Sequence, residues 1–525
     1  MPRESFLAGA FVLTVAAFIT KVLGAVYRIP LYPIIGDQGF GLFQMAYPIY
    51  GMVLVLSTSG INVAISKLVA ERLAKGDARG ASEAFKSSLF LLGSSGLVFS
   101  ILLFAGARFI AESVTRDARA TLCIAAISPA VLFVSVMSAY RGLFQGIRRM
   151  TPSAVSQIIE QFVRVVTMLV LAVVLIPRGV EYAAAGATFG AVTGAVGGLI
   201  YLLWVYRRDD VPRLLGYSQS RISIPTMAAV LRIAIPVSMA SGVLGLVQIV
   251  DMGIVPWRLQ AMGLATRVAT AQYGEMSGAA LPLVNMPTIL TAALQVSLVP
   301  AIAADIALRD SSHMVSRIRT SLRLTFQVML PAAVGLFILA DPISRLLFGD
   351  PDIAISLSAL AACTVFMGLQ QTTSGILQGM GQLRLPVKNL LWGVFWKLLL
   401  TTWLTGTIGI KGACYGTVAA FLVAGMLNLW SLMQRFGGIL DVKEAILLPA
   451  ISCVAMVLVV KGVYGLVLEA SGHSSLATVA AILFGAVGYL LALAVGGGLR
   501  KEDVEMVPKV GPTIARYMRK IGLLR

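Results

Sequence analysis

The sequence predicts an all-α polytopic membrane protein, and two observations support this fold class. Of its 525 residues, 58% are hydrophobic and 13% are charged, whereas soluble domains carry about 25% charged residues. Uncharged apolar windows of about 20 residues recur along the chain, and each can cross a hydrocarbon core of about 30 Å as a helix. We therefore expect about fourteen transmembrane helices, the first being a retained helix over residues 6–28 and not a signal peptide.

A near-repeat divides these helices into two sets. The pentapeptide GLFQG at residues 142–146 recurs as GILQG at residues 375–379, and the same offset of 233 relates Asp77 to Asp310. Further glycine matches occur at offsets of 226 and 221. We expect two halves of six helices each, followed by two more helices. Because six is even, both halves enter the membrane from the same side, as parallel repeats around a central cavity.

The repeat predicts four parts of the chain. They are an N-lobe over 1–217 (helices 1–6), a C-lobe over 218–440 (helices 7–12), two C-terminal helices over 441–499, and a basic tail over 500–525.

The net charge of +18 is placed mainly in alternate loops and in the tail. This asymmetry follows the positive-inside rule and predicts a multi-pass membrane protein with both termini in the cytoplasm. The tail fits either an amphipathic helix on anionic lipids or a solvated basic end. Basic stripes with interleaved aromatic residues are missing, so we expect membrane lipids and no nucleic acid as partners.

Enzyme chemistry and metal binding find no support in the sequence. The two histidines and four cysteines are scattered singly, and neither a Walker loop nor a GxSxG motif occurs. We expect a transporter without catalytic residues, metal or cofactor. A monovalent cation gradient, the membrane potential or the substrate's own gradient would then drive it.

Several cations lie where a bilayer disfavours them. Lys21, Arg164 and Lys397 fall inside predicted helices, where each costs about 2.5–3.5 kcal/mol unless it faces protein or water. Arg164 plus 233 gives Lys397, so both halves carry a cation at one position. These three residues either snorkel or pair between helices, or they line a cationic cavity for a phosphate or pyrophosphate. Arg28, at the outer end of the first helix, either joins them or marks the membrane interface.

Other polar residues and helix breakers are candidates for coupling and movement. Glu160 lies one turn before Arg164 and is a counter-ion or a coupling group; Asp251 is an interface residue or a cation ligand. Asn285 is a substrate-binding candidate in the eighth helix. Helix breakers occur at matching places in the two halves, as packing kinks or as hinges beside a cavity; they are Pro48, Gly51, Pro282 and Pro287.

Three stretches carry a family resemblance. They are the opening ITKVLGAVYRIPLYPIIGDQGFGLFQMAYPIYGMVLVLSTSGINVAISKLVAERLAKGD, the two pentapeptides, each followed by a proline (Pro152, Pro386), and AQYGEMSGAALPLVNMPTILTAALQVSLVPAIA. The chain resembles the polysaccharide-transporter branch of the MOP flippase superfamily, and within it the stage V sporulation protein B family and the MurJ-like lipid II flippases.

The resemblance implies two six-helix lobes that face a central cavity, with a membrane-facing groove formed by the last two helices. It also implies alternating access, in which a lipid-linked anionic glycan passes from the inner to the outer leaflet. Lipid II, a peptidoglycan precursor, is the leading substrate, and enzymes of cell-envelope synthesis are implied as partners.

The match to the lipid II flippases is incomplete. Lys21 occupies their first basic position, whereas Tyr27 stands at the second, with Arg28 one place later. Apolar residues near Leu54 and Val55 replace a basic pair. Another undecaprenyl-linked sugar, or a role restricted to sporulation, therefore stays open.

Two functions of other classes are alternatives to a flippase. A cation-coupled multidrug exporter of the related MATE family has similar lobes, but such exporters typically have twelve helices and an acidic drug site. A silent scaffold for envelope assembly would have little reason to keep buried charges.

Overall fold

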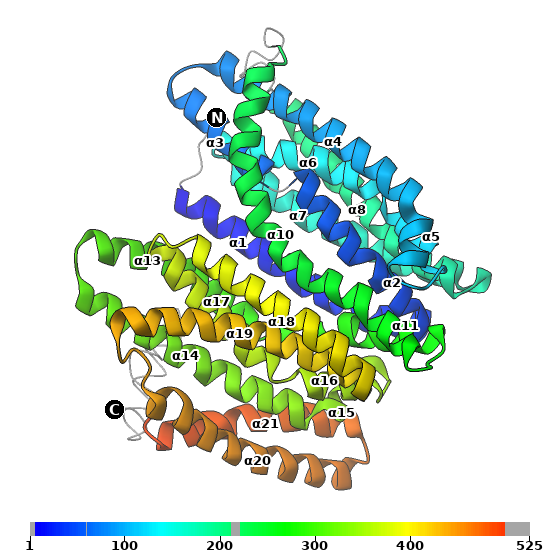
Figure 1. The fold of residues 1–525 in the computed structure, drawn as a ribbon, viewed down its shortest axis with the longest axis vertical. Helices are drawn as coiled ribbons and strands as arrows, with labels where there is room; N and C mark the ends of the chain where they lie inside the picture. The colour runs from blue at the N-terminus through cyan, green and yellow to red at the C-terminus, as the bar shows by residue number, and fades with distance from the viewer. Residues whose placement is uncertain (1–5, 59, 210, 212–220, 499–525) are drawn as a thin grey trace. The chain divides into compact units, whose positions relative to one another are not determined.

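The computed structural model describes residues 6–58, 60–209, 211 and 221–498, and all regular secondary structure within them is helical (Figure 1). Contacts divide the chain into two compact units, Met1–Gly278 and Ala279–Arg525. The predicted lobe boundary at 217/218 and the predicted tail over 500–525 lie outside the described residues. Contact density does not test a sequence repeat, so the four predicted parts stay a prediction.

Unit 1 contains ten α-helices in its described residues, together with a short 3₁₀ turn. They are α1 (Phe6–Val26), α2 (Arg28–Thr58), α3 (Ile61–Ala74), α4 (Ala78–Ser113), α5 (Ala120–Ile127), α6 (Pro129–Gly146), α7 (Met150–Leu175), η1 (Ile176–Arg178), α8 (Val180–Arg208), α10 (Ile224–Ala261) and α11 (Thr266–Gly274). The π-helix η3 (Glu275–Ala280) crosses the boundary between the units.

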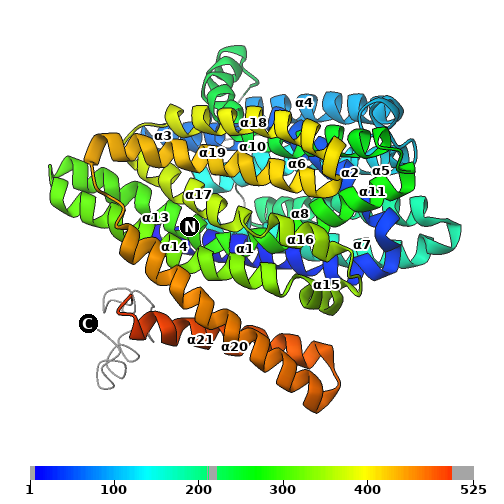
Figure 2. The same cartoon turned by 60° about the horizontal axis from the view of Figure 1, so that its bottom comes forward.

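Unit 2 contains the remaining helices. They are α12 (Leu281–Asn285), α13 (Thr288–Ala307), α14 (Ser311–Ile338), α15 (Ala340–Phe348), α16 (Ile353–Leu360), α17 (Cys363–Gly379), α18 (Arg384–Ile408), α19 (Ile410–Phe436), the π-helix η4 (Lys443–Leu447), α20 (Leu448–Ser471) and α21 (Ser474–Val495). The last two helices lie side by side and pack against each other (Figure 2).

The described residues confirm a multi-pass helical membrane protein, with fewer spans than the fourteen that the sequence predicts. Ten helical runs are long and apolar enough to cross a membrane, or eleven if α16 and α17, bent by 44°, form one span. One of these runs extends over residues 15–74 and includes α2 and α3, where the sequence predicts two spans. Another predicted span, α18, is outside this set; it buries Asn389 and Lys397.

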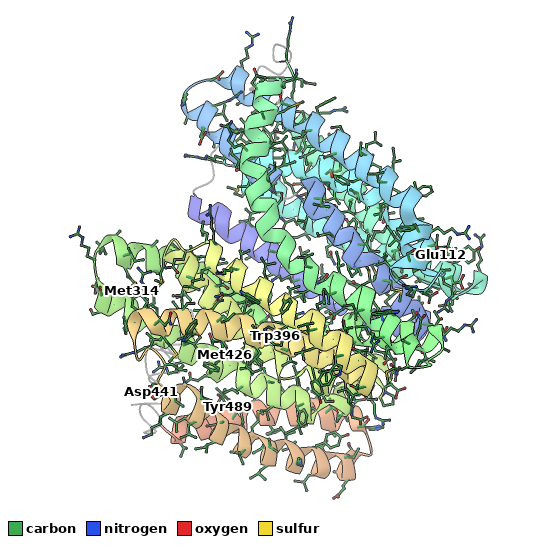
Figure 3. All side chains as sticks on the ribbon, viewed as in Figure 1. Glu112, Met314, Trp396, Met426, Asp441 and Tyr489 are labelled. Carbon is green, nitrogen blue, oxygen red and sulfur yellow. The ribbon has the colours of Figure 1, made fainter. Side chains whose placement is uncertain are left out.

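The outer faces of the helices carry large apolar side chains, as expected for surfaces that meet lipid (Figure 3). Trp396 on α18 is 44% exposed and Met426 on α19 is 48% exposed. Exposure of so many apolar side chains to water would cost free energy. The apolar surface therefore agrees with the membrane protein that the composition predicts.

The two matching pentapeptides end two helices in the same way. At the end of α6, the amide of Arg149 donates to the Phe144 carbonyl at 2.8 Å. At the end of α17, the amide of Gln382 donates to the Leu377 carbonyl at 2.9 Å. Arg148 (φ 60°) and Gly381 (φ 78°), 233 residues apart, both adopt positive φ. The sequence match therefore reflects a shared turn.

The glycines of each pentapeptide also share a packing role. Gly142 lies against Ile65 of α3, while Gly375 lies against Gln295 of α13. A side chain at either position would collide with the neighbouring helix, so these helices approach closely only because glycine has no Cβ.

The second matching turn has a shared helix cap. Asp77 accepts a hydrogen bond from the Gly80 amide at 2.7 Å and begins α4, and Asp310 accepts one from the His313 amide at 3.0 Å and begins α14. Each aspartate satisfies an amide that the first helical turn leaves open.

Asp117 lies in the connection between α4 and α5 and ties it to α11. Its side chain is 2% exposed and accepts hydrogen bonds from Arg119 and from the Thr270 hydroxyl, both at 2.7 Å. Burial raises the pKa of Asp117, but these hydrogen bonds outweigh it and hold the pKa below its ordinary value.

Asp117→Asn is expected to lower the free energy of unfolding by about 1.5–3 kcal/mol relative to the wild type near neutral pH. Because the folded pKa is below the unfolded value of about 3.9, this stabilisation is present above that pH and is lost as pH falls through the folded pKa. Thermal unfolding in detergent at pH 7 and pH 3 should show a large difference between the two proteins only at pH 7. Glu112→Gln, which removes an exposed pair with Arg108, is the control, and an equal effect of both substitutions would contradict the prediction.

Candidate substrate-binding site

An ionic cluster of three side chains lies buried in unit 1. Glu160 on α7 accepts a hydrogen bond from Arg164, one turn later, at 2.6 Å, and another from Arg141 of α6 at 2.9 Å. Arg141 also donates to the Ser156 hydroxyl at 2.8 Å. The side chains are only 12–17% exposed. One carboxylate thus pairs with two guanidinium groups and leaves an excess of positive charge.

Close packing of α7 on α8 fixes the position of this cluster. Glycines recur every four residues on α8 at Gly186, Gly190, Gly194 and Gly198. A Cβ added at Gly194 would lie 2.5 Å from the Glu160 carbonyl oxygen and 2.8 Å from the Arg164 Cβ. The small-residue stripe therefore sets how near the two helices come.

Gly194→Val is expected to destabilise the protein by about 1–3 kcal/mol, because α8 must move away from Glu160 and Arg164. Gly462→Val on α20 is the control, since a Cβ there meets no atom within 4 Å. Unfolding temperatures in detergent test this prediction, and equal values for the two variants would contradict it.

A row of aromatic side chains, from Tyr27 just before α2 to Tyr50 on α2, leads to the ionic cluster. Ring centroids are 6.3 Å apart for Tyr27 and Phe43, 4.8 Å for Phe43 and Tyr47, and 6.3 Å for Tyr47 and Tyr50. Arg164 interacts electrostatically with all three tyrosines. These three tyrosines and Arg164 of α7 therefore belong to one site.

Arg28, the first residue of α2, belongs to the same site. Its Nη1 donates to the Gly278 carbonyl at 2.7 Å, and its Cζ lies 5.7 Å from the centre of the Tyr27 ring. Both Arg28 and Arg164 interact electrostatically with Tyr47. The structure therefore brings two of the sequence-predicted cations to one tyrosine.

Four buried polar atoms of this site have no hydrogen-bond partner among the described residues. They are the Nε atoms of Arg28 and Arg164 and the hydroxyls of Tyr47 and Tyr50. All four can donate a hydrogen bond, and a buried donor without an acceptor is costly. The site is chemically suited to an anion with several oxygens.

Lys21 lies on α1, which packs against α7. It is exposed, one turn before Gly24, which faces the amide of Gln161 next to Glu160. Lys21, Arg28 and Arg164 thus lie on three helices of one unit.

The structure places the other predicted site residues on α10 of unit 1 and on helices of unit 2. Asp251 is 3% exposed on α10, and Asn285 ends α12 in unit 2. Lys397 is fully buried between α18 and α19 and donates to the Thr417 hydroxyl at 2.8 Å. Within unit 2, Lys397 is enclosed by helices.

The predicted hinges fall at different kinds of position. Helix α2 continues through Pro48 and Gly51, and its non-helical residue is Gly36 (φ 69°). In unit 2, Pro282 lies in the first turn of α12, and Pro287 precedes α13. Movement at these residues stays a prediction.

Sequence reasoning missed Arg141, Tyr47 and Tyr50. Arg141 stands at the edge of a predicted span, where a basic residue normally marks the interface. The spacing of Ser156, Glu160 and Arg164, four residues apart, indicated a polar face on α7 that needed a partner.

The fold and the site define a multi-pass helical membrane protein of the transporter class. A family described as polysaccharide biosynthesis protein matches residues 6–304, and a second, MatE, matches residues 259–403. The first match covers more than half of the chain. The protein therefore belongs to the polysaccharide biosynthesis family of the MOP superfamily, and it is a transporter, not an enzyme.

Relatives and solved structures extend this result. The chain is 29% identical to stage V sporulation protein B of Bacillus subtilis (strain 168), over 98% of this chain and 100% of the relative. It is 26% identical to the lipid II flippase MurJ of the same organism, over 92% and 94%. A structure of lipid II flippase MurJ in an inward closed conformation matches with a TM-score of 0.71 at 16% identity, covering 93% of this chain and 98% of that one. This last likeness shows the fold alone.

Proposed function

We propose that this protein is a flippase that carries a polyprenyl-pyrophosphate-linked sugar, with lipid II as the leading candidate, from the inner to the outer leaflet. The observation that carries the proposal is the group of four buried donors around Arg164 and Tyr47. A pyrophosphate offers several charged oxygens to such donors, and charge-assisted hydrogen bonds are the strong ones. The named activity of one relative, lipid II flippase MurJ, agrees with this choice.

Alternating access would move the substrate. In this proposal the chain has fourteen spans in two parallel six-helix lobes plus two C-terminal helices, with both termini in the cytoplasm. Glu160 holds the site together as a counter-ion. A monovalent cation gradient or the membrane potential supplies the energy, since the sequence lacks a Walker loop.

A multidrug exporter of the MATE type is the second candidate, supported by the MatE match over residues 259–403. A cationic drug requires a surplus of buried acids. The Arg141–Glu160–Arg164 cluster has the opposite balance, which favours an anionic substrate.

Lys21→Ala is expected to reduce outward movement of lipid II at least about tenfold, because one charged contact to the pyrophosphate is lost. Vesicles containing the purified protein and labelled lipid II would be assayed for label that becomes accessible outside. Lys461→Ala is the matched control, since Lys461 is also an exposed lysine inside a candidate span. Unchanged transport by Lys21→Ala would show that Lys21 does not bind the substrate. An equal loss of transport in Lys21→Ala and Lys461→Ala would contradict a specific role of Lys21.

A further inference from the structure

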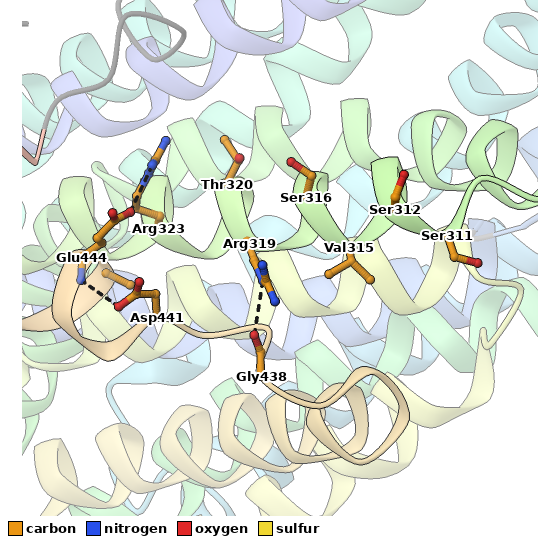
Figure 4. Close-up of a pocket in the computed structure, with 11 residues that line it drawn as sticks. Ser311, Ser312, Val315, Ser316, Arg319, Thr320, Arg323, Gly438, Asp441 and Glu444 are labelled. Atoms are coloured by element: carbon orange, nitrogen blue, oxygen red, sulfur yellow. Dashed lines mark hydrogen bonds and ion pairs between the residues drawn. The ribbon is translucent and has the colours of Figure 1, made fainter. Parts of the chain in front are cut away.

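A pocket of about 800 Å³, lined mainly by residues with polar side chains, lies wholly within unit 2 (Figure 4). It is formed by the first turns of α14 and by the linker from α19 to η4. Candidate membrane spans begin at Ser311, end at Phe436 and begin again at Lys443. The ends of spans lie where the hydrocarbon core gives way to headgroups, so the pocket lies at headgroup level.

The α14 wall of the pocket carries cations and hydroxyl groups. Arg319 and Arg323 are four residues apart, as are Ser316 and Thr320, so they share one side of the helix. Arg319 is exposed and its Nε donates to the Gly438 carbonyl at 3.2 Å. Arg323 is 5% exposed and also lines the pocket. This wall suits a phosphate.

The opposite wall carries two carboxylates. Asp441 accepts hydrogen bonds from the amides of Lys443 and Glu444 at 3.0 and 3.2 Å, which fixes it at the start of η4. Glu444 lies 3.5 Å from Arg323 and forms an ion pair with it across the pocket. This wall suits a group that is cationic and donates hydrogen bonds.

We propose that this pocket binds the zwitterionic headgroup of a phosphatidylethanolamine-type lipid. The phosphate lies on Arg319, Arg323 and the α14 hydroxyls, and the primary ammonium lies on Asp441 and Glu444. A purely anionic headgroup brings no cation to the two carboxylates. A choline headgroup has no N–H to donate to them. The site is independent of the Arg164 site and of the proposed transport.

The test measures lipid binding to the purified full-length protein in detergent. Phosphatidylethanolamine, phosphatidylglycerol and phosphatidylcholine with identical acyl chains are titrated, and binding is followed by native mass spectrometry and by the unfolding temperature. Phosphatidylethanolamine is expected to bind at least about tenfold more tightly than the other two. Soluble glycerophosphoethanolamine should compete with it, which separates headgroup recognition from acyl-chain binding.

Two variants test which wall of the pocket binds which part of the headgroup. Asp441→Asn keeps a capping oxygen, so the fold is retained, and it should weaken phosphatidylethanolamine about tenfold without weakening phosphatidylglycerol. Arg319→Gln should weaken both lipids. The matched controls are Asp341→Asn and Arg345→Gln, which alter an exposed pair on α15. Equal binding of all three lipids, no competition by the soluble headgroup, or unchanged binding by Asp441→Asn would overturn the proposal.

Discussion

Arg164→Gln is expected to reduce translocation of lipid II by about 100-fold, which corresponds to about 3 kcal/mol for the loss of strong contacts to a charged oxygen group. The fold should survive, because Glu160 keeps its bond to Arg141 at 2.9 Å. Initial rates in vesicles, together with the unfolding temperature, separate lost transport from lost structure.

Arg108→Gln is the matched control for this prediction. Arg108 also pairs with a glutamate four residues away, but its side chain is 81% exposed, and exposed pairs contribute little. Transport at the wild-type rate by folded Arg164→Gln protein would contradict the assigned role of Arg164.

Glu160→Gln is expected to have the largest effect on stability. It leaves the buried guanidinium groups of Arg141 and Arg164 without the carboxylate that both contact. Breaking a buried pair from one side costs about 3–5 kcal/mol, so we expect a strongly lowered unfolding temperature and a low yield of folded protein. Unfolding in detergent measures the first, and the monomer peak in size-exclusion chromatography measures the second.

Glu469→Gln, an exposed glutamate near the end of α20, should behave like the wild type. Glu160→Asp keeps the charge and should recover part of the stability. If Glu160→Gln were as stable as the wild type, Glu160 would not be the counter-ion that stabilises Arg141 and Arg164.

Local features that one helix or one turn determines could be predicted from the sequence. The two pentapeptides and the two aspartate caps recur at an offset of 233, and each pair has the same turn or cap in the structure. The pairing of Glu160 with Arg164 followed from their spacing of four residues.

Contacts between helices could not be predicted in this way. Arg141 of α6 pairs with Glu160 of α7, and Tyr47 of α2 lies in the electrostatic surroundings of Arg164; neither partner is marked by sequence spacing. Helix α2 continues through Pro48, and its non-helical residue is Gly36, where positive φ is open to glycine because it has no Cβ.

The central claim is that the buried hydrogen-bond donors around Arg164 bind the pyrophosphate of a lipid-linked sugar. The most direct measurement gives vesicles with wild-type protein two labelled substrates, lipid II and a neutral analogue with the same sugar and prenyl chain but no pyrophosphate. The account predicts that only lipid II reaches the outer leaflet. Equal movement of both, or movement of a cationic dye in place of lipid II, would contradict it.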